Sequence, residues 1–107
     1  MSTPAPDVLL ADCPARSALE LIADTWSVVV LVGLAHGSQR YSTLLERAGG
    51  ISKKMLTQTL RRLGDAGLVA RPATRGGDYR LTELGVSLLG PITALTAWAE
   101  EHAHELA

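Results

Sequence analysis

Residues 51–63 read ISKKMLTQTLRRL, and the spacing of this stretch decides the fold. On a helix that turns about 100° per residue, its polar side chains occupy one half of the circumference. The other half is apolar except for one threonine and comprises Met55, Leu56, Thr59, Leu60 and Leu63. Ser52 is a favourable N-cap residue and Gly67 a favourable residue just past the helix end. The pattern therefore predicts a helix over residues 52–66 that is half buried and half cationic.

Four further helices are predicted around this one. Residues 14–22 carry apolar side chains at spacings of three and four, and residues 26–35 are almost wholly apolar, which indicates a buried core helix that closes near Gly37. Thr43 and Glu46 have the spacing of a capping box, so we expect a short helix that begins at Thr43 and stops before Gly49 and Gly50. A long helix is expected to follow Thr82, which is another good N-cap residue.

A β-hairpin is predicted between the cationic helix and the long last helix. Residues 68–71 and 79–81 are short strand-like runs, and Gly76 and Gly77 supply the turn between them. Helix, turn, helix and hairpin is the order of a winged helix-turn-helix, a mainly α fold with a small β-hairpin (α+β). We expect residues 13–107 to form this single domain and residues 1–12 to be a flexible tail.

The charged residues are unevenly distributed along the chain. Residues 40–80 contain nine basic and three acidic residues, whereas the rest of the chain contains one basic and eight acidic residues. A net charge of −1 is thus an average over a basic middle and acidic ends. Such asymmetry suggests that the middle faces a polyanion, although an ordinary solvated surface also carries many lysines and arginines.

Double-stranded DNA is the polyanion that fits this fold. In a winged helix-turn-helix the second helix enters the major groove, and the hairpin lies against the backbone or minor groove. Arg61 is suited to guanine and Gln58 to adenine, because each side chain can make two hydrogen bonds to one base edge. Lys53 and Lys54 are expected at bases or phosphates, and Ser42, Thr43, Arg75 and Arg80 at the backbone. Thr57 and Arg62 on the same helix complete the candidate contacts.

The last helix carries a regular apolar seam. Spacings of four and three residues relate Leu88, Ile92, Leu95, Ala99, His102 and Leu106. So short a chain has little surface with which to cover such a helix, so we expect a homodimer in which two cationic helices reach successive major grooves, about 34 to 36 Å apart. The alternatives are a helix that folds back on its own core, or a protein-interaction module that uses this helix to bind another protein.

Several classes of protein are not expected. The longest apolar run, residues 28–35, is far shorter than the roughly 18 residues of a membrane span. The N-terminus lacks the pattern of a secretory signal, so we expect a cytoplasmic protein. No catalytic constellation stands out, and His102 and His104 would point about 200° apart on a helix. We therefore expect no enzyme, no metal and no cofactor.

Specific motifs are similar to those of the HxlR-type winged helix-turn-helix transcriptional regulators. They cover the chain from Cys13 to about His102 and comprise Cys13-Pro14, Trp26, Arg40-Tyr41, ISKKMLT at 51–57, Leu60-Arg61, Gly67-Leu68-Val69, YRLTELG at 79–85 and Trp98. The resemblance implies a dimeric bacterial-type regulator whose first and last helices form the dimer interface. Two features depart from the family pattern: the hairpin between Arg71 and Tyr79 is short, and Thr25 precedes the tryptophan where lysine is frequent.

The resemblance also draws attention to Cys13, the one cysteine of the chain. Some relatives sense oxidants or electrophiles through a cysteine at this position. The start of a helix and Arg16 would favour its thiolate, whereas Asp12 would oppose it, and many free cysteines are simply buried apolar residues. A ligand-responsive regulator is the alternative, with Cys13 structural and a small effector held near Trp26, Tyr41 or Trp98.

Overall fold

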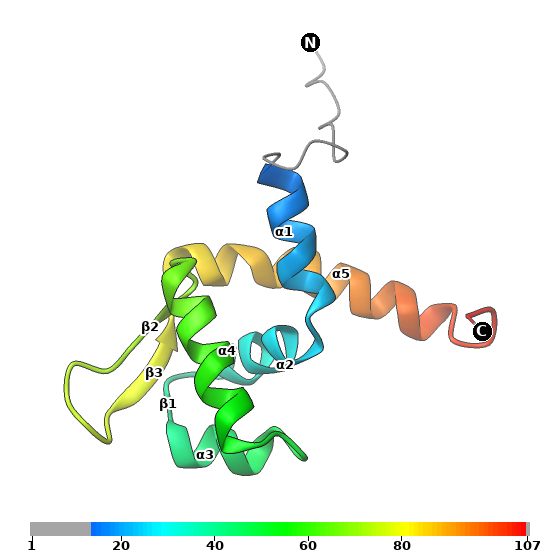
Figure 1. Ribbon diagram of the computed structural model, residues 1–107. Coiled ribbons are helices and arrows are strands. Elements are labelled where there is room, and N and C mark those ends of the chain that lie inside the picture. The colour runs from blue at the N-terminus through cyan, green and yellow to red at the C-terminus, as the bar shows by residue number, and fades with distance from the viewer. Residues whose placement is uncertain (1–13, 107) are drawn as a thin grey trace.

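The computed structural model describes residues 14–106, which form five helices and three short strands (Figure 1). The helices and strands follow the chain in the order α1 (Pro14–Ala23), α2 (Thr25–Leu34), β1 (Gln39–Arg40), α3 (Tyr41–Arg47), α4 (Lys53–Asp65), β2 (Val69–Ala70), β3 (Asp78–Leu81) and α5 (Glu83–Glu101). This is the expected mainly α arrangement with a small antiparallel sheet. Cys13 and the predicted tail over residues 1–12 lie outside the described residues.

Helix α2 is the centre of the domain. It packs against α1, α3, α4, α5 and β3, as expected for a helix that is apolar on every side. Val30, Leu31 and Leu34 are almost completely buried. They form one core with apolar side chains from the other elements, namely Leu44, Ala48, Ile51, Leu56, Leu60, Leu63, Leu68, Val69 and Ile92. The predicted core helix is thus confirmed, and Gly37, with φ at 133°, follows its end.

The sheet contains one strand more than the predicted hairpin. Its order is β1-β3-β2, and both pairings are antiparallel, with Val69 opposite Leu81 and Gln39 opposite Tyr79. Strand β1 has only two residues, too few for a period to be recognised in the sequence. Buried Gln39 is held there because its amide donates to the carbonyl oxygen of Gly33 and accepts from Nη1 of Arg47 at 3.0 Å.

The capping-box prediction for the third helix was wrong about where the helix starts. Helix α3 begins at Tyr41, and its N-cap residue is Arg40, in an extended conformation with φ −73° and ψ 157°. Thr43 and Glu46 therefore both lie inside the helix. The reason is tertiary: Arg40 is held extended by its pairing with Asp78 of β3, so the chain turns into a helix directly afterwards.

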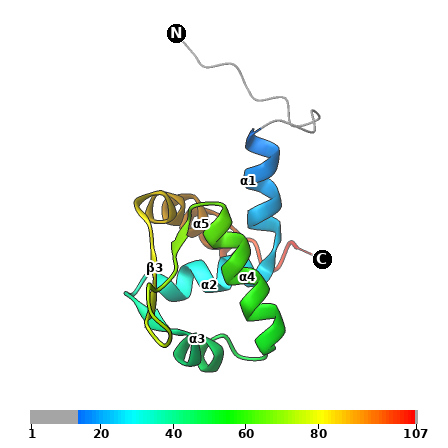
Figure 2. The same ribbon diagram turned by 60° about the vertical axis from the view of Figure 1, so that its left-hand side comes forward.

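The first two helices meet at a sharp elbow. Helix α1 has no buried residue and stands away from the rest of the domain in both views (Figure 1, Figure 2). The two helices are bent by 84° relative to each other. Among residues 14–106 no single helix is both long and apolar enough to cross a membrane, and only α1 and α2 taken together, as a bent pair, reach that length and composition.

Helix α5 has two different halves. Its first half packs on the domain, with Gly85 and Ile92 buried and Leu88 partly buried. Its second half extends away from the domain (Figure 1), and there Leu95 and Trp98 are 48% and 50% exposed. The seam predicted along this helix is therefore covered by the chain's own core over its first half only.

Candidate nucleic-acid interface

The turn between α3 and α4 is closed by well-defined local contacts. Ile51 is buried, and the amide of Ile51 donates to the carbonyl oxygen of Ala48 at 3.1 Å. The Ser52 hydroxyl accepts a hydrogen bond from the amide of Met55 at 3.1 Å, which is the predicted N-cap interaction. Gly50, with φ at 93°, has the left-handed conformation that glycine adopts without strain. The sequence of this turn therefore directs how α4 leaves α3.

Helix α4 has the two-sided character predicted from its sequence. Its apolar side faces the core, with Leu56, Thr59, Leu60 and Leu63 buried. Its other side is exposed to solvent and carries Lys53, Lys54, Thr57, Gln58, Arg61 and Arg62. Burial of one complete side prevents the helix from rotating, so the exposed side chains are presented in a defined direction.

Tyr41 joins the first helix of the motif to the second. Its hydroxyl donates to the carbonyl oxygen of Lys53 at 2.8 Å and forms a second hydrogen bond with the Thr57 hydroxyl at 2.9 Å. Both partners lie in the first two turns of α4. Tyr41 therefore holds the N-terminal end of α4 against α3. From the sequence alone, it is a candidate effector-pocket residue.

Arg71 makes the corresponding connection at the other end of α4. Its Nη2 atom donates to the carbonyl oxygen of Arg61 at 2.8 Å and to Asp65 Oδ1 at 2.9 Å. A Cβ atom at Gly64 would lie only 2.5 Å from Arg71 Nε, so the guanidinium lies directly on the helix backbone. No motif in the sequence points to this role of Arg71; the signal that could have revealed it is Gly64, an unfavourable residue inside a predicted helix.

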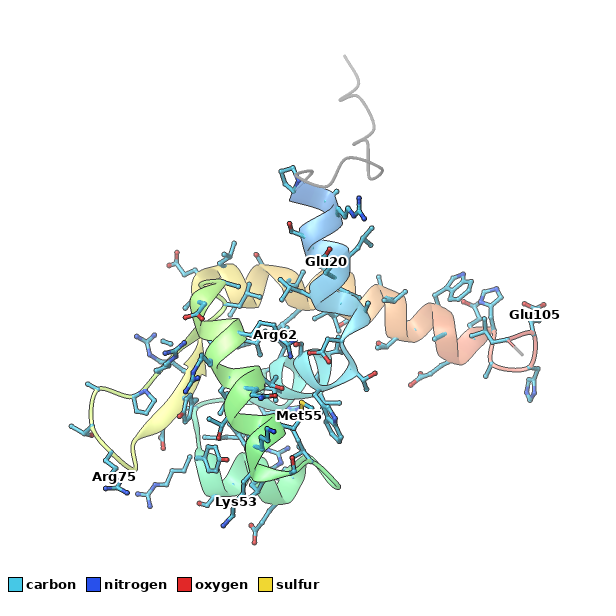
Figure 3. The ribbon with its side chains drawn as sticks, in the orientation of Figure 1. Glu20, Lys53, Met55, Arg62, Arg75 and Glu105 are labelled. Carbon is cyan, nitrogen blue, oxygen red and sulfur yellow. The ribbon has the colours of Figure 1, made fainter. Side chains whose placement is uncertain are left out.

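The cations of α4 and of the hairpin share one side of the molecule. Figure 3 shows Lys53 at the start of α4 and Arg75 at the tip of the hairpin on the same side, remote from Glu20 on α1 and Glu105 near the C-terminus. Within residues 14–106, no ion pair is found for five of the predicted contact residues, Lys53, Lys54, Arg61, Arg75 and Arg80. Their charge is therefore available to an external anion.

Arg62 and Arg40 differ from those cations in having acidic partners. Arg62 Nη2 forms an ion pair with Asp24 Oδ2, where α1 meets α2. Arg40 Nε lies 3.8 Å from Asp78 Oδ1. The charge of Arg62, which the sequence assigned to the DNA contacts, is thus shared with a carboxylate at the elbow.

The three aromatic residues considered for an effector pocket occupy different places. Trp26 is partly buried against the core. Trp98 is half exposed on α5 and stacks on His102, with the ring centres 4.8 Å apart. Tyr41 lines two shallow pockets beside α4 and the hairpin, and neither contains a tryptophan. These pockets therefore do not unite the three candidates.

A more apolar cavity of about 320 Å³ lies between α2 and α3. Its lining is aliphatic except for two basic side chains and comprises Val28, Val29, Val30, Val32, Gly33, His36, Leu44, Arg47 and Ala48. Cavities that bind small molecules begin at about this volume. No pattern in the sequence indicates this cavity, because its residues come from two helices whose packing the sequence does not specify.

Comparison with known proteins agrees with this architecture. The family model described as HxlR-like helix-turn-helix matches residues 21–107. The HTH-type transcriptional regulator YtfH of Escherichia coli, itself uncharacterised, is 36% identical over 98 residues, which cover 88% of this chain and 78% of that protein.

Solved structures show the same relationship. The structure of ytfH from Salmonella typhimurium superimposes with a TM-score of 0.80 at 31% identity, covering 94% of each chain. The reduced form of the transcriptional regulator YodB from Bacillus subtilis gives a TM-score of 0.79 at 28% identity, covering 89% of this chain and 98% of that one. A basic recognition helix, a short wing and these similarities lead to one conclusion: the chain belongs to the HxlR-like helix-turn-helix family and is a DNA-binding transcriptional regulator.

Proposed function

We propose that the protein binds a pseudo-palindromic operator as a homodimer, with α4 in the major groove and the hairpin on the neighbouring backbone. The observation that carries this proposal is the burial of one side of α4 only. Its apolar side packs in the core, while its cationic side is exposed beside the basic hairpin. A cytoplasmic location, as expected from the sequence, is part of this proposal.

The proposed contacts divide into base reading and backbone positioning. Arg61 and Gln58 lie on the exposed side of α4 and are assigned to guanine and adenine edges. Thr57, whose hydroxyl bonds with Tyr41, is adjacent to them. The remaining residues are assigned chiefly to phosphates, and they are Ser42, Thr43, Lys53, Lys54, Arg75 and Arg80. The shortness of the hairpin limits its contacts to the backbone next to the site.

A second copy of the chain is the proposed partner of α1 and of the second half of α5. Helix α1 has no buried residue, and large apolar side chains are exposed on both helices, including Leu19, Leu95 and Trp98. A symmetric dimer would cover these surfaces and would place two copies of α4 about 34 to 36 Å apart.

Cys13 is proposed as the responsive residue. Relatives of similar structure support this proposal: YodB from Bacillus subtilis has been solved in a quinone-bound form, and HypR is a redox regulator solved in its oxidised form. We propose that oxidation or alkylation of Cys13 changes the geometry of the dimer and hence its affinity for DNA. DNA binding by Cys13→Ser should not respond to diamide or quinones, and an unchanged response would contradict the proposal.

Fluorescence anisotropy across a salt series tests the DNA-binding proposal. The probes are a duplex from the region upstream of the protein's own reading frame and a scrambled duplex of equal composition. Arg61→Ala should reduce the preference for the cognate duplex by about 1 to 3 kcal/mol, the discrimination of one bidentate base contact. Arg16→Ala removes the same charge from α1, away from α4 and the hairpin, and should leave the preference unchanged.

The outcomes of this measurement separate the alternatives. If both duplexes bind equally with a steep salt dependence, selection from random DNA will show whether the operator lies elsewhere. If neither duplex binds at low salt under reducing conditions, the operator proposal fails and a protein-interaction module that uses α5 becomes the better explanation.

Ligand responsiveness is the second candidate function, favoured by the cavity between α2 and α3. Arg47 and His36 among aliphatic side chains suit a small amphipathic carboxylate. Octanoate should then release the Cys13→Ser variant from DNA. Adding Val32→Trp to that variant fills the cavity from its exposed edge and should abolish the release. Release that persists in Val32→Trp would place the ligand elsewhere.

A further inference from the structure

Asp24 occupies the elbow between α1 and α2. It is the N-cap residue of α2, with φ −85° and ψ 107°, yet its side chain makes no capping hydrogen bond to that helix. An aspartate at this position ordinarily accepts from an amide of the first turn. The carboxylate of Asp24 is therefore directed to other groups.

Those other groups are one serine and one arginine, and both meet the same oxygen atom. The Ser27 hydroxyl donates to Asp24 Oδ2 at 2.7 Å, and Ser27 is fully buried. Arg62 Nη2, from the C-terminal half of α4, donates to the same oxygen. Ser27 thus orients the carboxylate from inside the domain, and Arg62 reaches it from α4.

We propose that Arg62 is a positioning residue, which holds α4 against the α1–α2 elbow through Asp24, and is not a phosphate contact. This inference rests on the proposed function of α4. Figure 3 shows Arg62 near the elbow and far from Lys53 and Arg75, the two labelled cations of the DNA-facing side. Arg61, its neighbour, projects about 100° further round the helix and has no ion pair within residues 14–106.

The link connects two parts of the molecule with different tasks. Helix α1 packs on α2 but buries no residue, so its position responds to whatever covers it. A displacement of α1 would move the elbow, Asp24 and then Arg62. Because the Arg62 and Asp24 side chains are 48% and 26% exposed, their ion pair contributes little to global stability. Its principal effect is on the orientation of the C-terminal half of α4.

Asp24→Asn distinguishes positioning from phosphate contact, because the two roles predict opposite results. If Arg62 contacts phosphate, loss of the Asp24 charge frees its guanidinium and raises DNA affinity. If Arg62 is a positioning residue, Asp24→Asn and Arg62→Gln both lower affinity about fivefold, the equivalent of one partly exposed ion pair. Arg62→Gln should also leave the salt dependence unchanged, whereas loss of a phosphate contact would reduce the slope of log affinity against log salt by about 0.9.

The experiment is anisotropy of the full chain with the upstream duplex, together with amide hydrogen exchange of the free protein. Glu20→Gln is the matched control, since it removes the same charge from α1 and has no ion pair within residues 14–106. We expect faster exchange over the C-terminal half of α4 in Asp24→Asn and Arg62→Gln but not in Glu20→Gln. The reversed pair, Asp24→Arg with Arg62→Asp, should regain affinity relative to Arg62→Asp alone.

The two readouts keep the failures separate. Tighter or unchanged DNA binding by Asp24→Asn would overturn the positioning role, as would unchanged exchange in α4. If the parent protein binds no DNA, the proposed function has failed, and exchange alone decides whether Arg62 positions α4.

Discussion

Helix α4 and the second half of α5 each carry large apolar side chains, but these side chains have opposite surroundings. In α4 the residues Leu56, Leu60 and Leu63 are at most 2% exposed, because α2 and the hairpin cover them. In α5 the residues Leu95 and Trp98 are about half exposed, because this half of the helix extends past its own core. An apolar helix face in the sequence predicts that other residues will pack on it. Whether those residues belong to the same chain depends on where the fold places the helix.

The largest expected effect comes from opening the covered face. Leu56→Ala should lower the free energy of unfolding by about 2 to 5 kcal/mol, because it leaves a cavity in a fully buried site. Chemical denaturation at two protein concentrations measures it. Leu95→Ala is the matched change on the uncovered face, and its smaller effect should disappear on dilution, as the proposed dimer dissociates. A loss for Leu95→Ala that is independent of concentration would contradict the comparison.

The next largest effect concerns the association of two chains through the uncovered face of α5. Trp98→Ala should weaken the proposed homodimer by about 2 kcal/mol, because a large aromatic residue at an interface is a common hot spot. Sedimentation equilibrium gives the dissociation constant. Thr96→Ala is turned about 200° away on the same helix and should leave association unchanged. A monomeric parent protein would refute the dimer, and equal effects of both variants would refute the assignment of the face.

Thr59 offers a change of opposite sign on the covered face of α4. Its hydroxyl is buried without a hydrogen-bond partner among the described residues. Thr59→Val keeps the shape and removes the unsatisfied group, so the protein should become more stable by about 1 kcal/mol. Thr57→Val is the control: its hydroxyl bonds with Tyr41, and the substitution should destabilise the protein. Thermal denaturation measures both, and a destabilised Thr59→Val would show that this hydroxyl has a partner.

The smallest expected effect is at the helix starts. Ser52→Ala removes one capping hydrogen bond from α4 and should lower the free energy of unfolding by about 0.5 to 1 kcal/mol. Thr82→Ala should cost more, because the Thr82 hydroxyl accepts from the Gly85 amide at 3.1 Å and also donates to the carbonyl oxygen of Gly67 at 2.6 Å. Urea denaturation ranks the two variants, and the reverse order would contradict this account of the caps.

The elements with strong local signals were predicted correctly. Periodicity located α1, α2, α4 and α5, and the caps at Ser52 and Thr82 are present as expected. Strand β1 and the true start of α3 were missed for one shared reason. Both depend on the pairing of Gln39 and Arg40 with β3, about forty residues later in the chain. No local sequence pattern predicts such a contact.

The interface shows the same division. That α4 has a cationic side could be predicted from its sequence, because helical geometry alone sorts its residues. Which of its cations is paired with another part of the chain could not be predicted: Arg62 forms an ion pair with Asp24, whereas no ion pair of Arg61 is found within residues 14–106. The Arg62–Asp24 contact joins residues that are neighbours only after folding.

The sequence by itself thus determined the order of the helices and the hairpin, the half-buried cationic helix, its cap and the family, since these depend on spacing within one or two helical turns. Only the tertiary structure decided the third strand, the connections of Tyr41, Arg71 and Asp24 to α4, and the uncovered half of α5. The physical reason is that hydrogen bonds, ion pairs and burial between distant segments depend on how the helices pack.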